Sequence, residues 1–136
     1  MHYESSAIRE NEIPRSRVPL LEHAIETYAS EVNKLFATWR QFTPGDLEYR
    51  PHPKSASVGD VMKHELLSER RFFGEFLEAP EPPAAEVLPG EASPAGFAAR
   101  LGELARPRLA FLARQDEDWW LAPRPFFDVE RQRIWI

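Results

Sequence analysis

Apolar residues recur at intervals of three and four over a long stretch early in the chain. The series contains Leu21, Ala24, Ile25, Tyr28, Val32, Leu35, Trp39 and Phe42. At 100° per residue these positions form one narrow stripe, which is typical of an amphipathic α-helix with a single buried side. The spacing predicts a helix over 19–41, opened by Pro19, whose missing N–H costs nothing in a first turn. His23 lies opposite the stripe, so we expect it to be exposed to solvent.

A second helix is predicted after a short interruption, in which 43–46 indicates a single helical turn. Ser57, with Asp60 three residues later, resembles a capping box, so this helix should begin near Val58 and run to about Leu77. Its apolar side contains Val58, Val61, Met62, Leu66, Phe72, Phe73, Phe76 and Leu77. The core predicted from both helices contains Leu21, Tyr28, Val32, Trp39, Phe72, Phe73 and Phe76.

A serine–proline pair at 93–94 introduces a third helical pattern. Its apolar residues are Phe97, Leu101, Leu104, Leu109 and Leu112. Pro107 lies inside this pattern and predicts a kink or a break, because proline lacks an N–H and clashes with the preceding turn. Asp128 can cap a fourth helix beginning at Val129. The chain ends at Ile136 as this helix starts, so we expect a fold whose fourth helix is largely missing.

Two segments outside the helices differ in composition from the rest. Proline, alanine, glutamate and glycine dominate 79–94, which is typical of a connector between helices. Residues 1–18 are polar and lack periodicity, so we expect an extended N-terminal arm. A chain of 136 residues fits one domain, which we place at 19–136. The predicted fold class is all-α, an up-down four-helix bundle with a long second connection.

Composition excludes several classes of function. The 17 basic and 22 acidic residues give a net charge of −5, which argues against general nucleic-acid binding. No apolar run is long enough to span a membrane, and the N-terminal residues lack the pattern of a signal peptide. Cysteine is absent, so disulfides, thiol nucleophiles and thiolate metal sites are excluded. We expect a cytoplasmic protein without membrane or nucleic-acid partners.

Candidate chemistry is concentrated on the second helix. His64 lies at the edge of its apolar side, but a metal site needs three or four converging ligands. From the residues alone, a histidine at the surface or partly buried is therefore the better expectation. Glu65 and Glu69 fall within the apolar side, and two interpretations stay open. They are metal ligands on an inward helical face, or Glu69 meets neighbours such as Arg70 or arginines of another helix at the rim of the bundle. His2 and His52 have no partner at ligand spacing.

A family resemblance is carried by Leu-Glu-Tyr-Arg-Pro at 47–51 and by Ser-Ala-Ser-Val-Gly-Asp-Val-Met-Lys-His at 55–64. These segments are similar to an aromatic–Arg–Pro turn, a Ser–hydrophobic–Gly helix start and a histidine seven residues after the serine. Glu69, Arg70 and the aromatic residues after them continue the similarity. In this pattern the chain resembles the DinB-like superfamily of damage-inducible, metal-binding four-helix bundles.

The resemblance implies a divalent metal, zinc or nickel, held by three histidines, the first of which corresponds to His64. The other two come from an HxxxH motif on the last long helix, and this sequence contains no such motif. We therefore expect this chain to bind metal weakly or not at all. Some members of the family resemble thiol-dependent transferases or isomerases, in which the metal binds a small-molecule thiol and lowers its pKa.

Two functions remain open at the level of sequence. The first is a metal-dependent enzyme of the thiol-transferase or a related, hydrolase-like class, with His64 as one metal ligand. The alternative is a non-catalytic helical bundle that acts by oligomerisation or partner binding. Three helices without a fourth leave an apolar groove uncovered, and soluble monomers rarely leave such a patch open. We therefore expect a homodimer, since two-fold association is the commonest symmetric solution.

Overall fold

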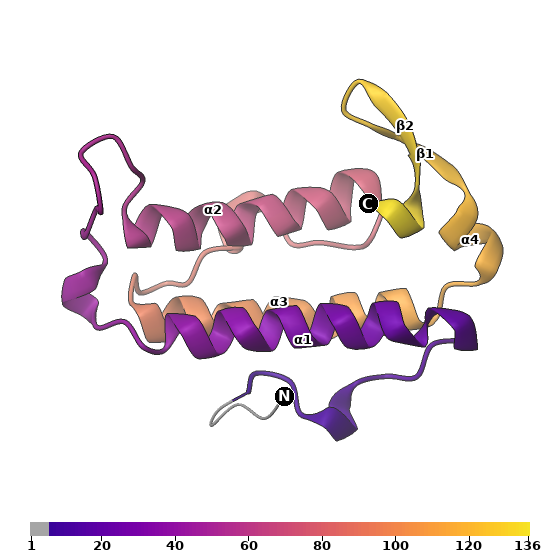
Figure 1. Ribbon diagram of the computed structural model, residues 1–136, viewed down its shortest axis with the longest axis horizontal. Coiled ribbons are helices and arrows are strands. Elements are labelled where there is room, and N and C mark those ends of the chain that lie inside the picture. Colours follow the sequence, from indigo (N-terminus) through magenta and orange to yellow (C-terminus); the bar gives the residue numbers. More distant parts are fainter. Residues whose placement is uncertain (1–5) are drawn as a thin grey trace.

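The computed structural model describes residues 6–136 (Figure 1). It is mostly helical, as expected, but adds one small antiparallel hairpin to the predicted all-α class. The helices are α1 (Glu22–Trp39), α2 (Val58–Arg71), α3 (Pro94–Ala113) and α4 (Glu117–Leu121), and the strands are β1 (Pro123–Phe126) and β2 (Val129–Gln132). None of the helices within 6–136 combines the length and the apolar character needed to cross a membrane.

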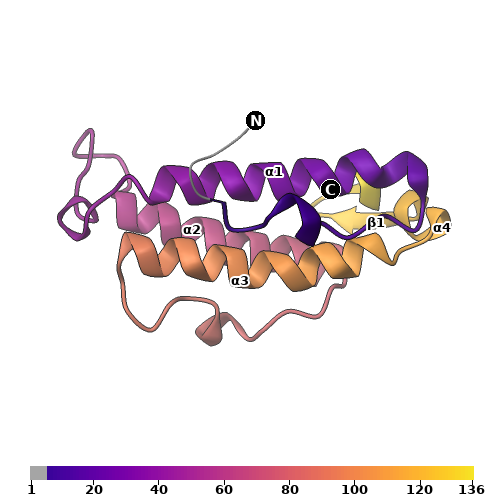
Figure 2. The same cartoon turned by 90° about the horizontal axis from the view of Figure 1, so that it is seen from below.

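The three long helices share one axis, and α1 runs antiparallel to both α2 and α3 (Figures 1 and 2). The segment 77–93 returns along the bundle, so α2 and α3 run parallel to each other. Apart from a 3₁₀ turn at Ala84–Glu86, this segment contains no helix or strand. It is the long second connection that the composition of 79–94 predicts. α1 packs along α3, and α2 lies over the two of them.

Side-chain caps begin α2 and α3 where the sequence predicts them. The Ser57 hydroxyl accepts a hydrogen bond from the Asp60 N–H at 3.1 Å, and the Asp60 carboxylate accepts one from the Ser57 N–H at 3.2 Å. The Ser93 hydroxyl accepts a hydrogen bond from the Gly96 N–H at 3.0 Å. These bonds satisfy backbone N–H groups that have no partner inside a helix. The predicted short turn forms as a 3₁₀ turn over Pro44–Asp46.

The predicted helical segments keep their extent but differ in detail. A 3₁₀ turn at Pro19–Leu21 precedes α1, and α2 ends in one turn of π-helix over Phe72–Phe76. α3 continues through Pro107, so the expected break is absent. Proline at this position removes a hydrogen bond to the carbonyl of Glu103. Because both residues are exposed, water can satisfy that carbonyl, which explains why the helix survives.

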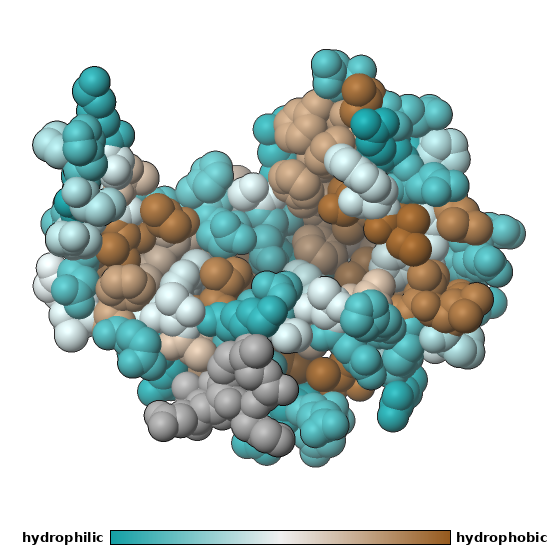
Figure 3. Space-filling model, in the orientation of Figure 1, coloured by the Kyte–Doolittle hydropathy of each residue, from teal (hydrophilic) through white to brown (hydrophobic). Residues whose placement is uncertain are grey.

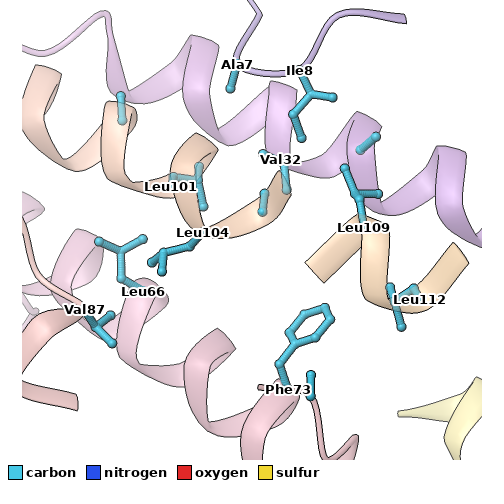
Figure 4. Packing of buried hydrophobic residues seen from close by; sticks show 14 of the residues in the cluster. Ala7, Ile8, Val32, Leu66, Phe73, Val87, Leu101, Leu104, Leu109 and Leu112 are labelled. Atoms are coloured by element: carbon cyan, nitrogen blue, oxygen red, sulfur yellow. The ribbon is translucent and has the colours of Figure 1, made fainter. Parts of the chain in front are cut away.

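The core lies where the three long helices meet (Figure 4). Its most buried side chains include Ile8, Ile25, Val32, Met62, Leu66, Val87, Phe97, Leu101 and Leu109. Ile8 belongs to the N-terminal arm, and the Asn33 side chain holds it to α1 with two hydrogen bonds of 2.8 and 2.9 Å. A Cβ on Gly102 would approach the Ala7 Cβ to 2.9 Å, so the arm lies directly on α3. The arm therefore contributes to the core.

The predicted core is confirmed in part. Val32, Trp39, Phe73 and Phe76 are buried, whereas Leu21, Tyr28 and Phe72 are half-buried. Val61 shares the apolar side of α2 but is 53% exposed. The exposure of Val61 and the partial exposure of Tyr28 and Phe72 have one cause: they lie where α1 and α2 do not close against each other.

The prediction of a fourth helix from Val129 is wrong. Residues 129–132 form β2, which pairs with β1 so that Phe126 lies opposite Val129. Phe127 has a positive φ of 54°, which reverses the chain in a two-residue turn. An isolated helix of eight residues is marginal in water, whereas the hairpin packs the Phe126 and Phe127 rings against Phe76 at 4.9 and 5.0 Å. Tertiary contact therefore overrides the local helical pattern.

Candidate functional site

Two pockets open on the side of the bundle formed by α1 and α2, and we call this side the α1–α2 groove. We call the first the Glu69 pocket; it has a volume of about 360 Å³. Its lining is Ala24, Tyr28, Glu65, Ser68, Glu69, Phe72, Phe73, Leu77, Leu112, Trp120, Arg133, Ile134 and Ile136. The second, the Trp39 pocket, has a volume of about 490 Å³. Its lining is Thr38, Trp39, Phe42, Tyr49, Pro51, Ser55, Ala56, Val58, Val61 and Met62. Apolar residues gather in two areas of this side of the molecule (Figure 3).

A buried ion cluster lies behind the Glu69 pocket. The Arg108 side chain on α3 is 1% exposed, and its Nε and Nη2 each donate to one Glu81 carboxylate oxygen at 2.8 Å. Its Nη1 donates to Glu69 Oε2 on α2 at 2.6 Å. The guanidinium also lies 4.9 Å from the centre of the Phe73 ring. Because Glu81 belongs to the long connection, this one arginine joins that connection to two helices.

Burial, opposed by Arg108 and reinforced by the nearby charges of Glu65 and Glu81, raises the pKa of Glu69 to about 7. Two of the guanidinium's hydrogen bonds go to Glu81, so the positive charge of Arg108 only partly balances the negative charge of the Glu69 carboxylate. Although burial acts against the charged form of Arg108, its hydrogen bonds with Glu81 leave the Arg108 pKa above its ordinary value. Glu69 is therefore a carboxyl group that changes charge close to neutral pH.

The Tyr28 side chain on α1 faces the same pocket from the opposite wall. Its hydroxyl is buried and has no hydrogen-bond partner of regular geometry among residues 6–136. Burial, reinforced by the charge of Glu69, raises the pKa of Tyr28, so the phenol stays protonated. The ring packs against Phe73 with 5.3 Å between centres. The hydroxyl therefore lies behind the pocket surface, where the charges of Glu69 and Arg108 both act on it.

The C-terminal residues close one end of the Glu69 pocket. Arg133 is buried; its guanidinium donates to Glu78 at 2.7 Å and to the Trp119 carbonyl at 3.2 Å. It also lies 4.8 Å from the Trp119 ring centre. Trp120 is 5% exposed, and its indole N–H has no partner within the described chain. This end of the pocket is thus aromatic, and its arginine shares the Glu78 carboxylate with Arg124.

His64 lies outside both pocket linings and is exposed. It follows Val61 by three residues and precedes Ser68 by four, and residues at these spacings share one side of a helix. Val61 lines the Trp39 pocket and Ser68 lines the Glu69 pocket, so His64 lies at the rim between them. His23 is exposed, as predicted, and His52 is exposed in a loop. His2 lies outside the described residues.

The open question about Glu65 and Glu69 is answered for Glu69. It meets Arg108 of another helix, as one of the two interpretations predicts, although the pair is buried. Arg108 and Glu81 were missed at the level of sequence. A signal for Arg108 exists, because it follows Leu101 by seven residues and Leu104 by four, inside the apolar stripe of α3. A buried arginine requires a carboxylate partner, but nothing local indicates that Glu81 is that partner.

Comparisons of the chain with protein-family models, with curated proteins and with solved structures return no match.

Proposed function

We propose that the chain is a DinB-like helical bundle whose functional site is the α1–α2 groove, with His64 as a metal ligand at the rim. The proposed class is a metal-dependent thiol transferase or a related enzyme acting on a small-molecule thiol. One observation carries the proposal: His64 shares a side of α2 with Val61 and Ser68, which line the two pockets. A metal ion on His64 would lie within reach of a molecule bound in the groove.

The topology supports the family part of the proposal. The resemblance implies a bundle with a long second connection, and the return of 77–93 along the bundle makes α2 and α3 parallel. The capped start of α2 at Ser57 places His64 in the second turn of that helix. The resemblance expects a histidine at this position.

A complete metal site does not form from the described residues. His64 is alone, and within 6–136 no three His, Cys, Asp or Glu side chains are grouped to hold a metal ion. Since zinc in proteins takes three or four such ligands, the others must come from another polypeptide segment or a second copy of the chain. No reaction step is therefore derived through the metal.

Metal titration tests the role of His64. We expect the 136-residue chain to bind zinc or nickel weakly and to lose it on dialysis, because a single histidine gives little affinity. His64→Ala should abolish this weak binding, whereas His23→Ala, at an exposed histidine on α1, should leave it unchanged. Binding that survives His64→Ala would contradict the proposal. Equilibrium titration with zinc or nickel compares the three proteins, and elemental analysis after dialysis verifies that the wild type loses its metal.

A second candidate function is partner binding through the groove, including self-association. The Trp39 pocket favours it, because its lining is mainly apolar and includes Val61, which is 53% exposed in the first turn of α2. Exposed apolar surface of this kind commonly marks an interaction site. A second copy of the chain is the occupant that we propose for this end of the groove.

A further inference from the structure

We infer that the Glu69 pocket binds a small organic cation, a primary amine with an aromatic or branched apolar body. The ammonium group would lie between Glu65 and Glu69, and the body would lie against the aromatic walls. This inference does not depend on metal binding by His64. It rests on the charge balance of the pocket, on its lining and on the Glu65 carboxylate.

The charge balance of the pocket favours a cation. Arg133 is paired with Glu78, and Arg108 gives two of its hydrogen bonds to Glu81. Glu65 lines the pocket, is half-buried, and has no hydrogen bond or ion pair with any residue of 6–136. Glu69 receives a single bond from Arg108. Glu78 is shared by Arg133 and Arg124, so three guanidinium groups stand against the four carboxyl groups of Glu65, Glu69, Glu78 and Glu81. The pocket and its surroundings thus have one carboxyl group in excess, and Glu65 is the one without a basic partner in the described chain.

The remaining walls suit the apolar body of such a ligand. Phe72, Phe73 and Trp120 line the pocket together with aliphatic side chains, of which Leu112 is buried. Aromatic rings provide apolar contact and also attract cations to their faces. A volume of about 360 Å³ lies in the range of small-molecule sites.

Amine binding should also depend on pH through Glu69, whose pKa is about 7. The charged groups that face Glu69 are Arg108 from α3, Glu81 from the connection and Glu65 from α2, with Tyr28 opposite. A cation binds the carboxylate form better, so affinity for the amine should rise as pH increases through 7. The ligand keeps its charge over this range, because an alkylamine such as the lysine side chain titrates near 10.4.

Two probes of equal size and opposite charge test the inference. In calorimetric titrations at pH 8 with EDTA present, 4-phenylbutylamine should bind at least about tenfold more tightly than 4-phenylbutyrate, since a charged hydrogen bond is worth this factor or more. Glu65→Gln should weaken amine binding by about tenfold. Glu26→Gln, at an exposed glutamate of α1 outside the pocket, should leave it unchanged. Circular dichroism verifies that both variants fold.

A second arm follows pH. Glu69→Gln should remove the increase in amine affinity between pH 6 and pH 8, while keeping a hydrogen-bond acceptor for Arg108. Equal binding of the two probes, tighter binding of the acid, no binding of either at millimolar concentration, or no effect of Glu65→Gln would each overturn the inference. Because EDTA is present, failure of amine binding leaves the metal proposal untouched. Failure of metal titration likewise leaves this inference untouched.

Discussion

At the scale of single residues, Arg108 is the charged residue with the lowest exposure in the described chain. Its guanidinium is removed from water, and every hydrogen bond that replaces hydration comes from a residue distant in sequence, 27 positions away for Glu81 and 39 for Glu69. The paired geometry with Glu81 matches the two donors of a guanidinium to the two oxygens of a carboxylate. Removing either partner leaves a charge buried without compensation, which costs more than the pair contributes when intact.

Arg108→Ala should therefore be strongly destabilising. It leaves two buried carboxyl groups without their donor, and breaking a buried pair typically costs about 3–5 kcal/mol of unfolding free energy. Arg114→Ala, one turn and a half further on at an exposed position, should change stability by no more than about 0.5 kcal/mol. Urea denaturation measures both. A small effect of Arg108→Ala would contradict the energetic role of the cluster.

Glu69 gives the protein a specific pH dependence. Its pKa is about 7 in the folded state against an ordinary value of 4.5, so the folded protein keeps a proton that the unfolded chain has already lost. Raising the pH from about 4.5 to 7 therefore favours unfolding, by about 3 kcal/mol at most. Glutamine does not ionise, so the stability of the Glu69→Gln variant should not decrease in this way between about pH 4.5 and 7. Urea midpoints from pH 5 to pH 8 should fall for the wild type relative to the variant; parallel profiles would contradict the assignment.

At the scale of elements, the π-helical turn and the hairpin depend on each other. The π turn ends α2 with Phe72 and Phe76, and the Phe126 ring lies 5.7 Å from the first and 4.9 Å from the second. Arg124 and Arg133 both pair with Glu78, directly after this turn. The hairpin has two strands only, and such hairpins are marginal in water without packing against other elements. The aromatic contacts supply that packing.

Phe76→Ala should cost about 3 kcal/mol or more of stability, because Phe76 is buried and contacts both rings of the hairpin turn. Phe72→Ala should cost less, since Phe72 is half-buried at the edge of the Glu69 pocket. Lys63→Ala, at an exposed position of α2, serves as the reference. Thermal denaturation ranks the three variants. A Phe76→Ala effect as small as that of Lys63→Ala would reject the described packing.

At the scale of the whole molecule, the return of the long connection decides which sides of the bundle are covered. The connection closes the side of α2 and α3, where Glu81 reaches Arg108 and Val87 is fully buried. Nothing within 6–136 covers the side of α1 and α2 in the same way, and both pockets lie there. The candidate site is thus a consequence of topology.

Self-association through this groove gives a prediction for the intact chain. Light scattering should detect dimers, and Val61→Lys should shift them to monomers, because it places a charge in the apolar groove. Stability should change little, since Val61 is 53% exposed. Val129→Lys, at a valine that is 41% exposed on the hairpin, should leave the dimer intact. A monomeric wild-type chain that binds no hydrophobic dye would contradict the prediction.

Local signals in the sequence determined where the long helices lie. The periodicity of 21–42 predicts α1, and Ser57 with Asp60 predicts the start of α2, because an amphipathic stripe and a cap act within a few residues of chain. The composition of 79–94 predicts the connector for the same reason. Helical spacing also places His64 at the edge of the apolar side of α2.

Tertiary structure decided the features that depend on distant residues. The segment after Asp128 has a helical pattern but forms a strand, because contacts with the aromatic residues of the π turn stabilise a hairpin there. Val61 is exposed although it lies on an apolar side, because α1 packs along α3 and leaves the groove open. The Glu69 pKa depends on a partner 39 residues away that is shared with Glu81. Sequence patterns act over single turns, whereas burial and charge compensation depend on which distant segments meet.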